Sequence, residues 1–282
     1  MLSLSQIEYR TMRLIVFTLM ILTPSWLMGL SPKRTYDRTP HDLRMKYEKL
    51  MIPSTSGSQL KAWYFPSDLG DQLMIISHDG VGNMGDYLER VKILVHYGFS
   101  VLIYDYRGFG ESSDFKINKY QYIYKEFYDD FDAVYNYAEN RFHHELIAYG
   151  WGIGAGISVS RGYQKDDIAG IIADEPFVDF TALKKQFIKI NAVMTLPSGI
   201  ENNEFNVLNV VQKEPGKNLR GILYLHGSNN FLYSTAEMEN LLQVTSHDFK
   251  DLYQFVVASR MDNFTVNESD YAKQIYSFVL NL

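Results

Sequence analysis

Short apolar runs that end in turn signals recur along the chain. We predict strands at Leu73–Ser77, Val101–Tyr104, Leu146–Tyr149, Ile168–Ala173, Ile222–Leu225 and Tyr253–Val257. Between them, Asp86–His96 and Lys125–Asn140 repeat apolar residues with the 3.6-residue period of a helix. Strands that alternate with helices predict an α/β fold, in which a mostly parallel sheet is covered by helices on both faces.

Two segments depart from this alternation. Tyr47–Ile52 and Leu60–Phe65 flank a turn-rich stretch at 53–58, which predicts an N-terminal hairpin. The less regular residues from 177 to 210 predict a small cap between two late strands. In open parallel sheets, functional groups gather beyond the carboxyl ends of the strands, so we expect the chemistry-bearing motifs to follow strands.

An uncharged stretch near the N-terminus predicts a membrane-directed segment. No charged residue occurs over 14–30, after Arg10 and Arg13. Positive residues before a short apolar stretch are typical of a signal peptide, and this stretch is at the lower limit of length for a membrane span. We therefore expect residues 1–33 to be a signal peptide or membrane anchor. Residues 34–282 then form one domain outside the cytoplasm, at the cell envelope.

Composition narrows the chemistry further. The net charge is −6 and the charges are interspersed, which disfavours nucleic acid as a partner. The chain has no cysteine, which excludes disulfides, thiolate catalysis and cysteine metal sites. Histidines and carboxylates do not recur at the spacing of metal ligands. We expect no metal and no cofactor.

Three glycine-containing motifs each follow a predicted strand. They are His-Asp-Gly at 78–80, Asp-Tyr-Arg-Gly-Phe-Gly-Glu-Ser at 105–112 and Gly-Trp-Gly-Ile-Gly at 150–154. In this order they resemble the α/β-hydrolase superfamily, and most closely its bacterial serine-hydrolase-like branch of esterases and acyl hydrolases. The resemblance covers residues 39–282. It implies an α/β-hydrolase fold, with a mostly parallel sheet of about eight strands, helices on both faces and a small cap.

The resemblance also implies where a catalytic triad would stand. The superfamily uses a serine, an acid and a histidine in that chain order. Gly152 falls at the serine position, Asn230 at the acid position and Arg260 at the histidine position. Glycine has no attacking atom, an amide cannot carry the charge that steadies an imidazolium, and arginine stays protonated. We therefore expect a pseudoenzyme, a hydrolase homologue without catalytic residues.

Such a homologue could still bind a ligand, because the backbone donors of an oxyanion hole need no serine. The predicted oxyanion-like residues are His78, Asp79 and Gly80 after the first parallel strand, with Trp151 and Ile153 beside the elbow. We expect a small acyl or carboxylate ligand, or a protein partner.

Two other interpretations stay open. The chain could be an active esterase or acyl hydrolase with unconventional residues, in which Asp174 or Glu175 supplies the acid. Alternatively, Gly150, Gly152 and Ala155 open a helix after a strand, with Asp174 about 20 residues further on, as in a dinucleotide-binding fingerprint.

Overall fold

The computed structural model describes residues 29–256, 258 and 263–282. Most of the predicted membrane-directed segment lies outside these residues, and so does Arg260. Among the helices in the described part of the chain, none is both long and apolar enough to cross a membrane.

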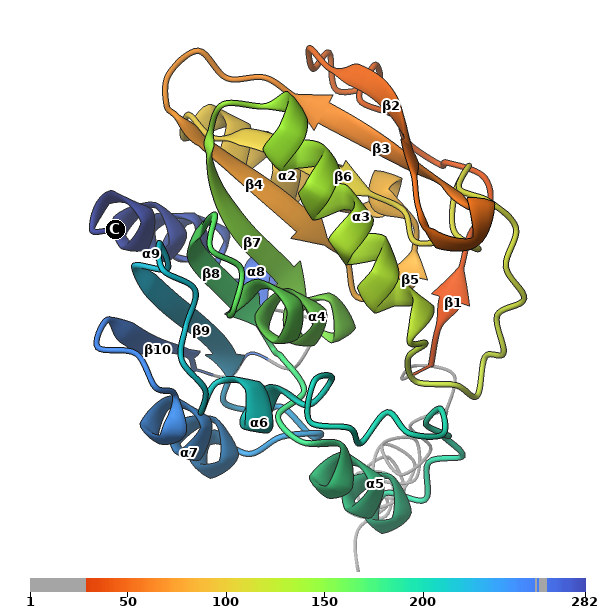
Figure 1. Ribbon diagram of the computed structural model, residues 1–282, viewed down its shortest axis with the longest axis vertical. Helices are drawn as coiled ribbons and strands as arrows, with labels where there is room; N and C mark the ends of the chain where they lie inside the picture. Colours follow the sequence, from red (N-terminus) through yellow and green to blue (C-terminus); the bar gives the residue numbers. More distant parts are fainter. Residues whose placement is uncertain (1–28, 257, 259–262) are drawn as a thin grey trace, which may run out of the picture.

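The central feature is an eight-stranded sheet in the order β10-β9-β8-β7-β4-β6-β3-β2 (Figure 1). Its strands are β2 (Glu48–Pro53), β3 (Gln59–Phe65), β4 (Gln72–Ser77), β6 (Ser100–Tyr104), β7 (Glu145–Trp151), β8 (Ile168–Asp174), β9 (Gly221–Gly227) and β10 (Lys250–Phe255). Neighbouring strands pair in parallel from β10 through β9, β8, β7 and β4 to β6. At the other edge, β3 joins β6 antiparallel and forms an antiparallel hairpin with β2. The sheet is therefore mostly parallel, as predicted.

Helices cover both faces of this sheet (Figure 1). The helices are α2 (Leu88–His96), α3 (Glu126–Arg141), α4 (Ile153–Gly162), α5 (Phe180–Lys189), α6 (Val207–Val210), α7 (Thr235–Val244), α8 (Asn263–Val266) and α9 (Glu268–Leu280). Buried side chains of α3, α4 and α7 pack in one apolar cluster, and those of α2 and α9 in a second cluster on the opposite face. The two clusters form the core, and the predicted layering is confirmed.

The central strands are buried along their whole length, which explains why their apolar runs are continuous. Every residue of β8 and β9 is buried, and so is β7 after its first residue. Strands covered on both faces read as unbroken apolar segments, because neither side alternates with solvent. Side chains placed at the carboxyl ends of these strands therefore sit on a rigid base.

Two element boundaries differ from those predicted. The helix predicted from residue 86 begins as a short 3-10 turn at Met84–Tyr87, and α2 follows at Leu88. Asn83 and Asp86 form a capping box that starts this turn. At the sheet edge, β10 ends at Phe255 although we predicted a strand to residue 257, and the next residue, Val256, is exposed.

Two short strands join the N-terminal residues to the domain. β1 (Ser31–Pro32) pairs in parallel with β5 (Val81–Gly82), which follows β4.

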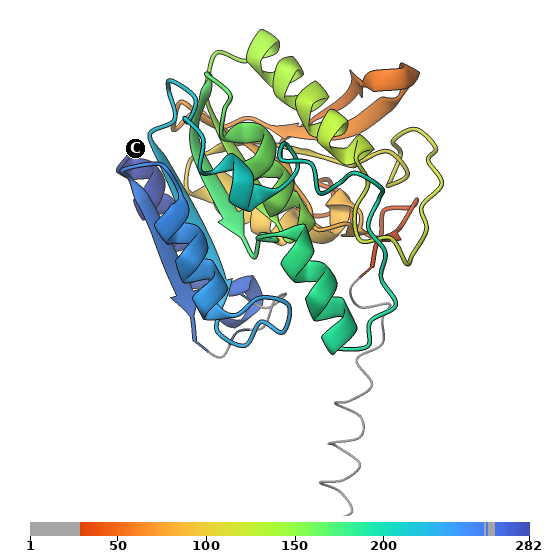
Figure 2. The same ribbon diagram turned by 60° about the horizontal axis from the view of Figure 1, so that its bottom comes forward.

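The predicted cap region between β8 and β9 contains α5 and α6. The capping residue Asp179 accepts a bond from Asn206 at 2.6 Å, and Figure 2 shows α5 at one end of the molecule.

Candidate functional site

The turn between β7 and α4 is sharp and carries no side chain at its apex. Gly152 has φ 54° and ψ −116°, and its N–H donates to the Asp174 carbonyl oxygen at 2.8 Å. A positive φ favours glycine, because a Cβ would be strained there. A Cβ on Gly150 would lie 2.2 Å from the Gly154 carbonyl oxygen, and one on Gly154 would lie 2.1 Å from the Ser77 carbonyl oxygen. These glycines let β4, β7 and α4 approach closely.

Trp151, which precedes the apex, is packed into the core. Its side chain is 2% exposed, and its indole N–H donates to the hydroxyls of Tyr149 and Tyr271 at 2.9 Å each. Its ring stacks on Tyr87 with the centroids 5.1 Å apart, and the guanidinium of Arg90 lies 4.8 Å from its centroid. Trp151 therefore anchors the turn and presents little surface to a ligand.

The loop after β4 is held by its own side chains. His78 is fully buried, and its Nδ1 accepts the Gly80 N–H at 3.1 Å. This bond identifies Nε2 as the protonated nitrogen, which faces Asp105 Oδ1 at 3.5 Å. Asp79 accepts from the Tyr87 hydroxyl. The N–H of Gly80, one of the predicted oxyanion-like residues, is thus already paired.

Leu30 covers this loop. A Cβ on Gly80 would lie 2.5 Å from Leu30 Cδ2 and 2.8 Å from Ile153 Cδ1, so these two side chains fill the space beside it. Leu30 is 2% exposed and Ile153 is 1% exposed. The Ser31 N–H donates to the Gly80 carbonyl oxygen at 2.9 Å, which fixes the covering segment in place.

A buried carboxylate organises the ends of β8 and β9. Glu175 follows β8 with a positive φ of 55°, a strained conformation for a residue with a side chain. Its carboxylate accepts from the N–H of Gly227 at 2.5 Å, from the Nδ2 of Asn230 at 2.5 Å and from the Nδ2 of Asn263 at 3.1 Å. It also bonds to Nδ1 of His226 at 2.9 Å. Four partners therefore hold Glu175, which offsets its strain.

The neighbouring Asp174 is a second buried acid. It accepts from the Tyr271 hydroxyl at 2.6 Å and from Asn263 Nδ2 at 2.7 Å, and the guanidinium of Arg90 lies 4.0 Å away. Burial raises the pKa of Asp174 to about 6, although Arg90 opposes the shift. Asp174 therefore takes up a proton more readily than an exposed aspartate does.

The sequence motifs did not identify three of these contacting residues. Asn263 and Tyr271 come from α8 and α9, far along the chain from the elbow. No local motif marks either residue, because their partners are about 90 to 100 positions away in sequence. Arg90 did leave a signal. It is a charged residue beside the apolar stripe of α2, which contains Val91 and Leu94.

Comparison with known proteins assigns the family. The family model described as serine aminopeptidase, S33, matches residues 70–248 of this chain. The chain belongs to this S33 family. It is therefore a member of the α/β-hydrolase superfamily, and the predicted fold class is confirmed.

Two curated relatives of this S33 member are named as uncharacterised proteins. An uncharacterised membrane protein of Saccharomyces cerevisiae, YNL320W, is 23% identical over 266 residues, which cover 92% of this chain and 88% of the relative. The uncharacterised protein YfhR of Escherichia coli K12 is 22% identical over 245 residues, which cover 83% of this chain and 81% of the relative. Their names give no reaction.

Solved structures agree on the fold of the S33 member. An esterase of Pyrococcus furiosus superposes with a TM-score of 0.73 at 17% identity, over 89% of this chain and 96% of the esterase. A monoglyceride lipase variant of S. cerevisiae superposes with a TM-score of 0.60 at 15% identity, over 83% of this chain and 97% of the lipase. At such identities the likeness concerns the fold alone.

The S33 fold brings two of the three predicted triad positions to one end of the sheet. Gly152 bonds to the Asp174 backbone, and the adjoining Glu175 accepts from Asn230 in the turn after β9. Arg260 lies outside the described residues. Ser158 and Ser160 are buried inside α4, and Ser160 donates to a carbonyl oxygen of its own helix.

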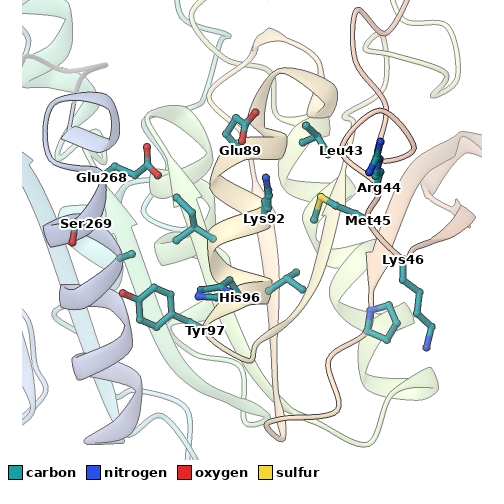
Figure 3. Close-up of a pocket in the computed structure, with 14 residues that line it drawn as sticks. Leu43, Arg44, Met45, Lys46, Glu89, Lys92, His96, Tyr97, Glu268 and Ser269 are labelled. Carbon is teal, nitrogen blue, oxygen red and sulfur yellow. The ribbon is translucent and has the colours of Figure 1, made fainter.

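The S33 member also has a cavity that the predicted site residues do not line. A cavity of about 690 Å³ lies between α2, α9 and the segment 43–46 (Figure 3). Lys92 and His96 of α2 line it together with Glu268 and Ser269 of α9, but none of the predicted site residues does. Over residues 29–256, 258 and 263–282, no group of three or more histidines and carboxylates is placed to hold a metal ion.

Proposed function

We propose that this S33 member is a catalytically inactive homologue that acts by binding. The observation that carries the proposal is the bare apex of the elbow, where Gly152 has φ 54° and no side chain. Superfamily hydrolases place the nucleophilic serine on this strained turn. Without that hydroxyl no acyl-enzyme can form there.

The surroundings of Asn230 support the same proposal. Its amide nitrogen donates to Glu175, and its oxygen accepts from the Leu232 N–H at 2.7 Å. Both ends of the amide are thus used to build the turn after β9. A neutral amide at the acid position cannot stabilise a protonated histidine. Arg260, proposed at the histidine position, cannot act as a base because a guanidinium stays protonated near neutral pH.

A small acyl or carboxylate ligand is the partner that this turn suits best. The helix α4 begins at Ile153, and the first N–H groups of a helix attract negative charge. Because Leu30 fills the space beside Gly80, such a ligand enters only if Leu30 moves. A protein partner remains the alternative, which needs no opening of the loop.

We further propose that the domain is held at the cell envelope by its N-terminal segment. The uncharged stretch over 14–30 follows Arg10 and Arg13, the order found in signal peptides and anchors. Protease treatment of intact cells checks the location. The proposal expects digestion of the domain, and a domain that survives until the cells are lysed contradicts it.

A second candidate function rests on His226. Its Nδ1 is held by Glu175, while its buried Nε2 has no hydrogen-bond partner among the described residues. A carboxylate that orients an imidazole and leaves Nε2 free is the arrangement of a general base. The alternative proposal is therefore an active hydrolase in which His226 activates water.

The geometry does not favour a dinucleotide. Asp174 is the acid that would bind a ribose hydroxyl in the fingerprint. Here its two oxygens are bonded to Tyr271 and Asn263, and its side chain is buried. No carboxylate oxygen of Asp174 is therefore open to a ribose.

Ester turnover by the full chain distinguishes the two candidates. We would assay p-nitrophenyl esters of short and long acyl chains with the wild type, with His226→Gln and with the restored triple variant Gly152→Ser, Asn230→Asp, Arg260→His. The inactive homologue predicts a silent wild type and turnover by the restored variant. Turnover by the wild type that His226→Gln abolishes supports the second candidate and overturns the first.

A further inference from the structure

One surface around α5 combines exposed apolar side chains with lysines. We define this cap face by Tyr120, Lys185, Ile188, Lys189 and Val193. Its apolar members are well exposed, since Ile188 is 77% exposed and Val193 is 63% exposed. Single exposed apolar residues are common on proteins. Two within six residues, with a half-exposed tyrosine beside the same segment, form a patch that needs an explanation.

The helix α5 is amphipathic, and its inner side is already used. Phe180, Leu183 and Phe187 are buried in the core, so the outer side is not needed for folding. Figure 2 shows this helix at one end of the molecule. Ile188 on the outer side is therefore available to a partner.

The charge of the cap face is opposite to that of the whole chain. The net charge of the chain is −6, yet Lys185 and Lys189 are exposed on this face and have no ion-pair partner among the described residues. Lys184 is already neutralised by Glu201. Lys119 adds a cation that lies 5.1 Å from the ring centroid of Tyr120. This face therefore complements an anionic surface.

The chain enters the domain beside the same face. A Cβ on Gly29 would lie 2.0 Å from the Lys119 carbonyl oxygen and 3.3 Å from Met194 Cε. Met194 follows Val193 directly, and the Thr195 N–H donates to the Tyr120 carbonyl oxygen at 2.7 Å. Gly29, which belongs to the uncharged stretch over 14–30, therefore lies beside the cap face.

We propose that the cap face docks on a lipid bilayer that contains anionic lipid. Exposed isoleucine, valine and tyrosine enter the headgroup boundary, and the lysines pair with anionic headgroups, as in interfacial amphipathic helices. The proposed N-terminal anchor keeps this face close to the bilayer. The inference therefore rests on the envelope proposal for its setting, but it is independent of catalytic inactivity. Each lysine near an anionic surface favours the docked state about five-fold.

A single-label experiment tests this docking. The chain has no cysteine, so Ile188→Cys carries one environment-sensitive fluorophore without side reactions. Leu69→Cys is the matched control, because Leu69 is an apolar residue of similar exposure, 81%, in the β3–β4 connection. Full-length protein is added to neutral vesicles or to vesicles that contain about 30% phosphatidylglycerol by moles. Both kinds of vesicle carry a doxyl-lipid quencher.

We expect quenching at position 188 in the anionic vesicles and little at position 69. The double variant Lys185→Glu, Lys189→Glu in the 188-labelled chain should lower the ratio of docked to undocked protein about 25-fold, since two lysines at about five-fold each are removed. A label at 188 that is no more quenched than one at 69 overturns the docking proposal. Flotation of the unlabelled chain with the vesicles reports separately on the anchor. Flotation without quenching at 188 overturns docking only, and quenching without stable flotation supports docking but not the anchor.

Discussion

The conformation of Gly152 makes a quantitative prediction about stability. Its φ of 54° with ψ of −116° is a region that side-chain-bearing residues rarely occupy. Holding such a residue there costs about 1–3 kcal/mol. Replacing glycine also restricts the unfolded chain, which offsets about 0.4–1 kcal/mol of that cost. We therefore expect Gly152→Ser to lower the free energy of unfolding by about 1.5 kcal/mol, and Tm by about 3–6 °C for a domain of this size.

The assay is thermal and urea unfolding of the full chain with three variants. Gly152→Ala should lose about as much stability as Gly152→Ser, because the cost comes from the Cβ and not from the hydroxyl. Gly57→Ala is the calibration, since Gly57 has φ 76° and no atom within 4 Å of an added Cβ. A serine variant as stable as wild type would refute the reasoning that glycine relieves strain at the elbow.

Three further predictions follow from buried groups. Burial raises the pKa of Asp174 to about 6, so the folded state holds a proton that the unfolded state has lost between about pH 4 and 6. The contribution of Asp174 to wild-type stability should therefore fall by about 3 kcal/mol as pH rises through that window, so wild type should lose stability relative to Asp174→Asn in urea titrations. A wild type that becomes more stable over this window relative to the variant would contradict the raised pKa. Arg107→Ala should cost about 3–5 kcal/mol in chemical denaturation, because it leaves the buried Asp130, now 2.6 Å from Arg107 Nη2, without its cation. A loss below about 1 kcal/mol would show that this pair is not desolvated. Leu30→Ala should cost about 2–5 kcal/mol and open space beside Gly80, so calorimetry should detect tighter binding of short fatty acids. Unchanged fatty-acid affinity would separate Leu30 from the ligand site.

The layers of the fold could be predicted from the sequence because the central strands are buried on both faces. β8 and β9 are buried throughout and apolar until their carboxyl ends, so their runs stand out without any knowledge of partners. The edge strand β10 is only partly buried over most of its length, so its pattern did not define its ends. The start of α2 was displaced because the Asn83 capping box supplies a 3-10 turn that periodicity does not reveal.

The candidate site was predictable only where it is local. Glycine spacing located the elbow at Gly152, since close backbone approach demands glycine within a few residues. The bonds of Glu175 to His226 and Asn263 join positions 51 and 88 residues apart. Single-sequence patterns do not encode such long-range pairs. For the same reason, Leu30 was assigned to the N-terminal segment although it packs against the loop after β4.

The pairing of β1 with β5 has a mechanical consequence for a chain tethered at its N-terminus. The Ser31 and Lys33 N–H groups each donate at 2.9 Å, to the carbonyl oxygens of Gly80 and Gly82. Tension applied before Gly29 runs along a strand that is parallel to its partner, so both hydrogen bonds bear the load together in shear. The first part of the domain to feel a pull is then the loop that faces the elbow. A pull on the N-terminal segment would therefore be transmitted to the loop after β4 through these two hydrogen bonds.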